Sequence, residues 1–185
     1  LGRAPDYHFL PVGNAGNYTA YHRGYTEELA RGRTDRMPRM FGFQAAGSAP
    51  FVLGEKVTSP DTIASAIRIG NPASWDLALA AQTDSDGYFG AIDDPGILAA
   101  HRLLSRDVGV FVEPSSAISV AGLLERADAG VLEKGATAVL AVTGHGLKDP
   151  QWALKDAEGS DIQPTKLPVD VDLVAEELEL TGGQS

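Results

Sequence analysis

Short apolar runs alternate along this chain with longer stretches in which apolar residues recur every three or four positions. Runs without polar alternation are typical of strands buried on both faces of a parallel sheet, and the longer spacing is typical of helices. The runs predict strands at residues 7–12, 39–46, 88–92, 109–113 and 136–142. The other stretches predict helices at residues 17–32, 62–69, 72–82, 94–106, 115–130, 150–155 and 171–180. This order predicts an α/β fold with a largely parallel sheet and flanking helices.

Polar residues and prolines mark where several of these helices begin. Asp93 precedes a proline-containing helix start and is expected to be its N-cap. Ser115 or Ser116 is expected to cap the helix that follows the strand at 109–113, and Pro72 suits the first position of its helix.

The turn at residues 13–17 joins the first predicted strand to the first predicted helix. Such a junction presents backbone N–H groups to an anion at a helix N-terminus. Gly13 and Gly16 are expected to take positive φ angles, and Asn14 and Asn17 to donate hydrogen bonds or cap the helix. The turn has no lysine, so it is not a Walker loop. It predicts a phosphate cradle, with an ordinary tight turn as the alternative.

A second glycine-rich turn, residues 143–146, follows the last predicted strand. The hydroxyl of Thr143 can bond to a ligand's ring nitrogen without placing a full charge beside it, and Gly144 and Gly146 leave space around it. The alternative is a turn in which Thr143 only satisfies the backbone. Ligands of such sheets bind at the carboxyl ends of strands, where both turns lie.

Charge and composition narrow the classes of partner. The chain has 185 residues, which suits one domain or a large piece of two, and a formal net charge of −10. That balance argues against nucleic acid and anionic membranes as partners. The absence of cysteine excludes disulfides, thiolate metal sites and cysteine nucleophiles, and no apolar run is long enough to cross a membrane.

Other polar residues near the turns have ordinary interpretations. We expect His145 to be a surface or capping residue, and Lys148 a surface lysine because a polar loop does not desolvate its amine. Glu113 ends a predicted strand, so it could reach a site but more simply caps the next helix. Residues 84–87 match the Asp-x-Asp-Gly part of a calcium loop, but the further Asp or Asn and the final Glu of that loop are missing. They therefore predict an ordinary turn.

Five segments, taken together and in order, resemble the threonine synthase family. They are residues 11–17 with the helix that follows, 41–50, 62–75, 109–117 and 143–150. The resemblance covers the chain to about residue 156 and is nearest to a bacterial branch of the family. It implies the fold of tryptophan-synthase-β-like enzymes that use pyridoxal phosphate, and the conversion of O-phospho-L-homoserine and water to L-threonine and phosphate. A homodimer and a cytoplasmic location are implied in the same way.

The resemblance also assigns roles to residues. The cofactor phosphate is matched by the whole turn: Gly13, Asn14, Ala15, Gly16 and Asn17. Asn14 is also placed toward the substrate phosphate. Thr143 matches the residue bonded to the pyridine nitrogen, and residues 70–74 match a segment beside the cofactor ring.

The chain departs from the family by lacking two motifs. One is a Ser-Phe-Lys-Asp-Arg-Gly-like segment that carries the Schiff-base lysine, and the other is a Ser/Thr-Gly-Asn-Thr/Ser loop that grips the substrate carboxylate. On this interpretation the lysine lies upstream of Leu1. None of the chain's own lysines takes its place: Lys56, Lys134, Lys148, Lys155 and Lys166. Residues 1–156 are then the C-terminal part of the cofactor-binding domain, 157–185 are an extension with a terminal helix, and the chain alone is expected to be inactive.

Two alternatives remain open at this point. A serine/threonine dehydratase or cysteine-synthase-like enzyme shares the fold, but that group more often has a serine-type hydroxyl at the ring nitrogen and a tetraglycine-like phosphate loop. A non-catalytic module could bind a phosphorylated small molecule through residues 13–17. It would bind phosphate ligands but form no threonine.

Overall fold

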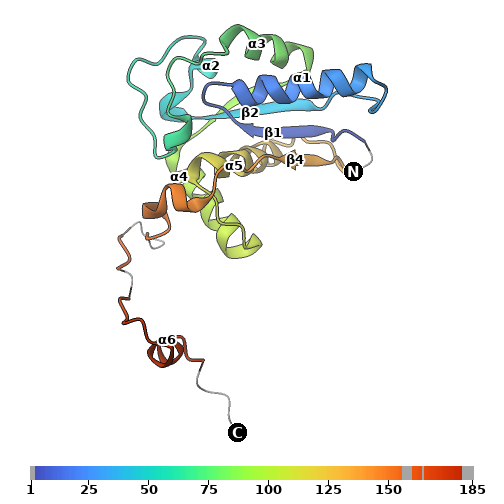
Figure 1. Ribbon diagram of the computed structural model, residues 1–185. Coiled ribbons are helices and arrows are strands. Elements are labelled where there is room, and N and C mark those ends of the chain that lie inside the picture. The colour runs from blue at the N-terminus through green and yellow to red at the C-terminus, as the bar shows by residue number, and fades with distance from the viewer. Residues whose placement is uncertain (1–2, 156–159, 164, 181–185) are drawn as a thin grey trace. The chain divides into compact units, whose positions relative to one another are not determined.

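A parallel sheet lies at the centre of the first of two units into which the chain divides, the unit that ends at Pro150 (Figure 1). The computed structural model describes residues 3–155, 160–163 and 165–180. Within those residues the sheet has four strands in the order β3-β2-β1-β4. They are β1 (Tyr7–Pro11), β2 (Arg39–Ala45), β3 (Tyr88–Ile92) and β4 (Ala138–Leu140).

The pairing of the strands places both glycine-rich turns at one edge of the sheet. All neighbouring strands are parallel, and Phe9 of β1 lies opposite Phe41 of β2 on one side and Leu140 of β4 on the other. Beyond β4 the chain continues alongside β1, because the Ala141 N–H donates to the Phe9 carbonyl over 2.9 Å. The segments after β1 and β4 therefore leave the carboxyl ends of two adjacent strands, where ligands of parallel sheets bind.

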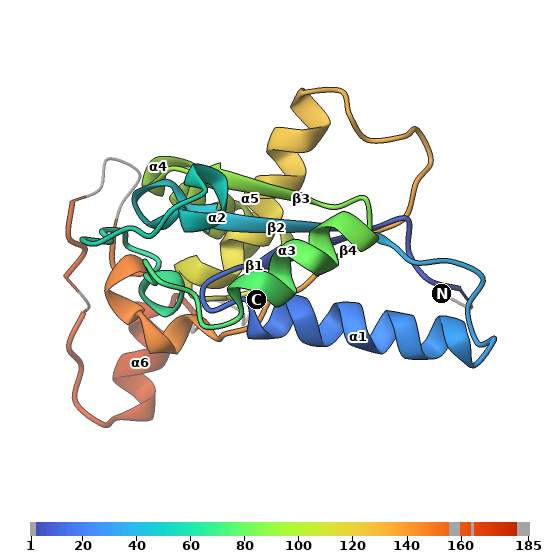
Figure 2. The same cartoon turned by 90° about the horizontal axis from the view of Figure 1, so that it is seen from above.

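Helices cover both faces of the sheet. Figures 1 and 2 show α1 and α3 on one face and α4 and α5 on the other. The helices are α1 (Gly16–Ala30), α2 (Pro50–Leu53), α3 (Trp75–Asp84), α4 (Asp94–Leu103), α5 (Pro114–Asp128) and, in the second unit, α6 (Val171–Glu177). Short 3₁₀ turns lie at Ala46–Ser48, Ser65–Ile67, Gly146–Lys148 and Pro150–Trp152, and a π turn at Leu104–Val108. In the described ranges no helix has the length and apolar character needed to span a membrane.

Alternation along the strands divides the core into two clusters. Tyr7 and Phe9 join the cluster that contains residues of α4 and α5, and Leu10 joins the cluster that contains residues of α1 and α3. All three side chains are at most 2% exposed. Because successive side chains of a strand point to opposite faces, a continuous apolar run can be buried on both sides. The parallel sheet with helices on both faces confirms the α/β fold class that the sequence predicts.

Three predicted elements are wrong. The helix predicted at 150–155 is only the 3₁₀ turn Pro150–Trp152, and in the other two the backbone bonds elsewhere. The helix predicted at 62–69 is only the 3₁₀ turn Ser65–Ile67. Here the Ile63 N–H donates to Asp94 Oδ2 over 3.1 Å, and side-chain bonds of this kind compete with a helix. The strand predicted at 109–113 forms only an isolated bridge, because its backbone groups pair with the turn at residues 143–146.

The predicted helix starts have mixed outcomes. Asp93 is an N-cap, since its Oδ1 accepts from the Gly96 N–H over 2.9 Å. The serines do not cap α5: Glu113 holds the N-cap position, and Pro114, whose fixed φ suits the first turn, comes next. Helix α3 begins at Trp75 rather than at Pro72. In the second unit α6 lies within the predicted range 171–180, whereas residues 157–159, 164 and 181–185 of the predicted extension lie outside the described residues.

Lowering the pH is expected to destabilise the folded chain through His8. Its side chain is buried in β1, with Nδ1 3.1 Å from the Tyr25 hydroxyl, and burial lowers its pKa to about 4. In the unfolded chain His8 is protonated near pH 6.5, whereas in the folded chain it is protonated only near pH 4. Stability is therefore full above pH 6.5 and falls through this window, by on the order of 3 kcal/mol.

Urea unfolding at pH 7.5, 6 and 5 measures this loss. His8→Phe keeps an aromatic ring but cannot titrate, so its stability should depend less on pH. Burial also lowers the pKa of His101, which leaves a smaller slope of the same sign in the variant. Equal slopes in both proteins would contradict the assignment to His8.

Candidate phosphate cradle and hydroxyl at the carboxyl edge of the sheet

Ala15 has the left-handed conformation in the turn after β1. Its φ is 61° and its ψ is 12°, while neither Gly13 nor Gly16 has a positive φ. The expectation for the two glycines is therefore wrong. Gly13 instead allows a close approach, since a Cβ there would lie 3.1 Å from the Cα of Ile67, a tighter contact than most. A non-glycine residue held at positive φ is strained, and such strain gathers at functional sites.

The start of α1 leaves a row of backbone donors without acceptors. No acceptor is found among the described residues for the N–H groups of Ala15, Gly16 and Asn17, and the first backbone N–H that bonds to a carbonyl of the turn is that of Thr19, to Ala15 over 3.0 Å. Successive free N–H groups at the positive end of a 15-residue helix form a concave site for an anion. A Cβ on Gly16 would meet nothing within 4 Å, so the space beside it is open.

The two asparagines hold the turn in shape and do not act as N-caps. Asn17 donates from Nδ2 to the Pro11 carbonyl over 2.8 Å and accepts from the Tyr18 N–H at Oδ1. Asn14 accepts from the Ala73 N–H at Oδ1 over 3.2 Å. This bond fixes the amide plane of Asn14 and leaves its NH₂ group as a donor. The N-cap position belongs to Ala15, which has no side chain for the purpose.

Ser116 organises the second turn from the first part of α5. Its buried hydroxyl accepts from the Thr143 N–H over 3.0 Å and from the Gly144 N–H over 2.6 Å. The same oxygen lies 3.0 Å from Thr143 Oγ1. Thr143 itself is exposed, so its hydroxyl is anchored from behind and open in front. The serine read from sequence as a cap thus holds the turn that carries the candidate hydroxyl.

Glu113 is buried beside the same turn. Its side chain is 2% exposed and forms no capping bond to α5, and Oε1 lies 3.5 Å from the exposed amine of Lys148. Lys148 is on the surface as predicted. His145 is also confirmed as a capping residue, because Nδ1 accepts from the Leu147 N–H over 3.2 Å.

Gly144→Ala is expected to destabilise the chain by about 2 kcal/mol, the usual scale for overpacking. A Cβ on Gly144 would lie 2.0 Å from Oε1 of the buried Glu113. Chemical denaturation measures the loss. Gly24→Ala is the control, because a Cβ there meets nothing within 4 Å and alanine favours the helix. In a Glu113→Ala background the loss should shrink; an equal loss would show that Glu113 is not the obstacle.

The loop at Ser65–Ile67 contacts both the first turn and helix α5, whose Ser116 holds the second turn. The Ala66 N–H donates to Ser115 Oγ over 3.1 Å, and Ile67 lies against Gly13 as described above. Sequence reasoning missed this bridge and the role of Ser116. Two serines directly after Pro114 were the available signal, but nothing local to them shows that their partners lie 27 to 49 residues away.

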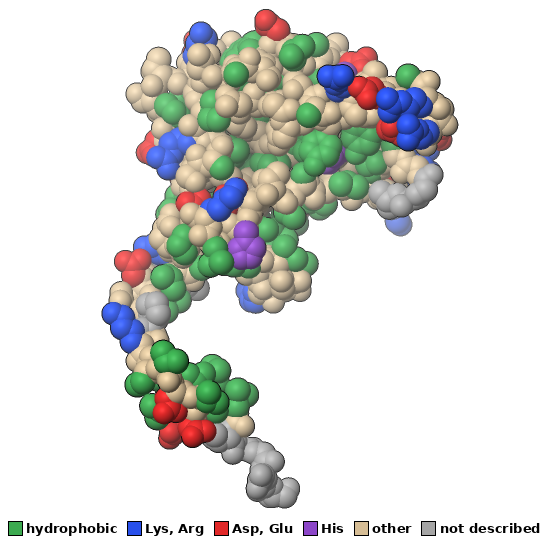
Figure 3. Space-filling view, in the orientation of Figure 1, with side chains coloured by type: hydrophobic (Ala, Val, Ile, Leu, Met, Phe, Trp, Pro, Cys, Tyr) green, Lys and Arg blue, Asp and Glu red, His purple; other side chains and the backbone are tan. Residues whose placement is uncertain are grey.

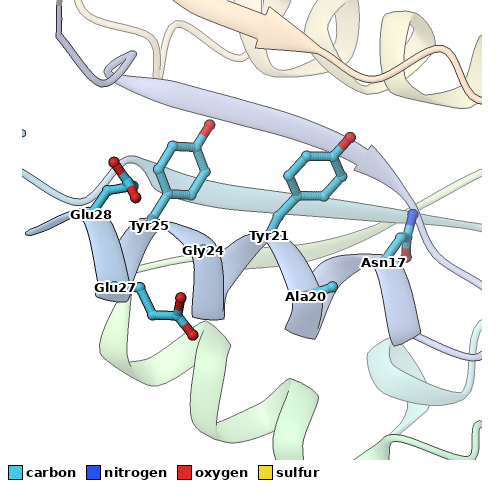
Figure 4. A pocket seen from close by; sticks show the side chains of 7 residues that line it. All are labelled: Asn17, Ala20, Tyr21, Gly24, Tyr25, Glu27 and Glu28. Carbon is cyan, nitrogen blue, oxygen red and sulfur yellow. The ribbon is translucent and has the colours of Figure 1, made fainter. Parts of the chain in front are cut away.

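A groove along α1 is separate from this site. Figure 4 shows Tyr21 and Tyr25 extending from the same side of the helix, and Figure 3 shows hydrophobic side chains gathered on the face of the molecule that includes α1. The groove has a volume of about 490 Å³. It is lined by Asn17, Ala20, Tyr21, Gly24, Tyr25, Glu27 and Glu28. Only Asn17 belongs to the turn, and two carboxylates make the groove unsuited to a phosphate.

Known proteins resemble this chain in sequence and in structure. The family described as pyridoxal-phosphate dependent enzyme matches residues 1–144. The threonine synthase of Mycobacterium leprae is 58% identical over 95% of this chain and 47% of its own length. The threonine synthase of Synechocystis is 51% identical over 95% of this chain and 45% of its own length. The chain thus spans about half the length of the curated relatives it matches.

Solved structures show the same fold at low sequence identity. A fungal L-serine ammonia-lyase from Rhizomucor miehei has a TM-score of 0.62 at 23% identity, over 76% of this chain and 45% of its own. Maize serine racemase has a TM-score of 0.58 at 18% identity, over 95% of this chain and 46% of its own. The predicted fold is confirmed as that of these enzymes. Together with the sequence match over residues 1–144, this places the chain in the pyridoxal-phosphate dependent enzyme family.

Proposed function

We propose that the complete protein is a threonine synthase, which converts O-phospho-L-homoserine and water to L-threonine and phosphate. The observation that carries the proposal is the row of free N–H groups at Ala15, Gly16 and Asn17, which suits the phosphate of pyridoxal phosphate. The 58% identity to a threonine synthase supports this reaction over others performed on the same fold. A homodimer and a cytoplasmic location are parts of the same proposal.

The residues present fit the cofactor at both of its ends. Its phosphate would be held by the turn that contains Gly13, Asn14, Ala15, Gly16 and Asn17. The space beside Gly16 is open, and the NH₂ group of Asn14 adds a donor for the cofactor or substrate phosphate. Thr143 offers a neutral hydroxyl to the pyridine nitrogen. When bound, pyridoxal phosphate supplies the electron-withdrawing ring that makes substrate protons removable.

We propose further that the lysine that holds the cofactor is outside this chain, which alone is then inactive. Lys56, Lys134 and Lys166 are exposed and Lys148 pairs with Glu113. Lys155 pairs with Asp161 in the second unit. A reactive lysine needs a desolvated amine or a neighbouring cation, and none of these five has such surroundings.

The test uses the complete gene product. With pyridoxal phosphate and O-phospho-L-homoserine it should release threonine and phosphate in equal amounts, and borohydride reduction should link the cofactor to a lysine outside the present sequence. Keto acid and ammonia from serine or threonine would instead identify a dehydratase. Binding of the cofactor without any turnover would favour the non-catalytic module.

A further inference from the structure

The Ser116 hydroxyl lies near two oxygens that could accept its single proton, and it also accepts hydrogen bonds from two backbone N–H groups. A hydroxyl has one proton to donate and two lone pairs that accept. Both lone pairs of Ser116 Oγ are used by backbone groups, the N–H groups of Thr143 and Gly144, at 3.0 and 2.6 Å. Its single proton must therefore point to one of two remaining oxygens. These are Thr143 Oγ1 at 3.0 Å and the Gly144 carbonyl at 3.3 Å.

This count determines the direction of the bond between the two hydroxyls. If Thr143 donated to Ser116, the serine oxygen would receive three protons on two lone pairs. The shorter distance also favours Thr143 Oγ1 over the carbonyl as the acceptor of the serine proton. Thr143 Oγ1 is then an acceptor on its buried side, and its own proton is directed to the open side of the turn.

We infer that Ser116 is a positioning residue, which makes Thr143 a hydrogen-bond donor toward the ligand. The inference rests on the proposed function, in which that ligand atom is the ring nitrogen of pyridoxal phosphate. A donor in this position stabilises a ring nitrogen that carries no proton, because a protonated nitrogen would need an acceptor there. Ser116 thus acts on the cofactor through Thr143 without touching it.

Helix α5 offers a matched control. Ser119 is as fully buried as Ser116 and lies one turn further along, but its hydroxyl donates to the Ser116 carbonyl over 3.0 Å inside the helix. The titratable groups near the turn include Glu113, Lys148, His145 and Asp149, and all of them are retained in each variant. Differences between Ser116→Ala and Ser119→Ala therefore report the bond to Thr143.

The experiment is ¹⁵N NMR of the complete gene product loaded with pyridoxal phosphate labelled at the ring nitrogen, followed from pH 6 to 9. The native protein and Ser119→Ala should keep the shift of an unprotonated nitrogen throughout. Ser116→Ala frees Thr143 Oγ1 to accept, so the proton affinity of the nitrogen should rise at least about tenfold, and its shift should move toward that of a protonated nitrogen as the pH falls to 6. An unchanged profile in a folded Ser116→Ala protein would overturn the inference.

Two further variants separate the possible failures. Thr143→Val should change the ring-nitrogen shift more than Ser116→Ala. If Thr143→Val changes the shift and Ser116→Ala does not, only the role of Ser116 is refuted. If neither changes it, the contact between Thr143 and the cofactor is refuted as well. Ser116→Cys covers the case in which alanine prevents folding, since the thiol is a weak donor and acceptor of similar size. An intermediate profile supports the inference, and a native profile contradicts it.

Discussion

Thr143→Val in the complete gene product is expected to lower the turnover of O-phospho-L-homoserine by about 10²-fold, the scale of losing one preorganised donor. Valine has nearly the shape of threonine but lacks the hydroxyl that would bond to the ring nitrogen. Folding should be retained, because Thr143 is exposed and its backbone N–H keeps the bond to Ser116. The loss should therefore lie in kcat, with little change in the unfolding free energy.

Steady-state kinetics with a phosphate-release assay measures this effect. Thr137→Val is a suitable control, since it makes the same change just before the other end of β4, and Thr143→Ser should restore most of the rate by returning the hydroxyl. Full activity in Thr143→Val would remove Thr143 from the site. Equal losses in both valine variants would indicate a general effect on the strand.

Sequence alone predicts the elements whose signal is local. The runs around Phe9, Phe41 and Phe89 are apolar without alternation, and each became a strand of the sheet, because burial on both faces needs no information from elsewhere in the chain. The Asp93 cap is equally local, since its partner is three residues away. The position of the candidate site could be predicted because, in a parallel sheet, the turns that follow the strands all lie at the edge formed by their carboxyl ends.

The errors arise where partners are far apart in the chain. Residue pattern alone does not reveal that Asp94 binds the backbone of Ile63, or that Ser116 holds Thr143 and Gly144. The sequence also indicated a cradle at the correct turn but placed the left-handed residue at the glycines. In the structure Ala15 takes that conformation, while Gly13 packs closely against Ile67.

Asn14→Asp is expected to weaken the binding of pyridoxal phosphate by roughly 30-fold, or about 2 kcal/mol. Aspartate has the same shape, and its Oδ1 can still accept from the Ala73 N–H, so the turn should remain folded. The change removes the NH₂ donor and places a negative charge beside the phosphate. Two like charges about 4 Å apart repel by about 1 kcal/mol in water and about 4 kcal/mol near a protein surface, and the exposed Asn14 falls between these limits.

Cofactor titrations at two salt concentrations separate the two parts of this effect. The repulsion should weaken at high salt, whereas the loss of a donor should not. Asn14→Ala removes the donor without adding charge, so its loss should be smaller and independent of salt. Gln82→Glu on α3 adds the same charge away from the turn and should bind the cofactor normally. If Asn14→Asp also binds it normally, the phosphate does not lie at the start of α1, because no anion held by the N–H groups of Ala15, Gly16 and Asn17 could be indifferent to a carboxylate at residue 14.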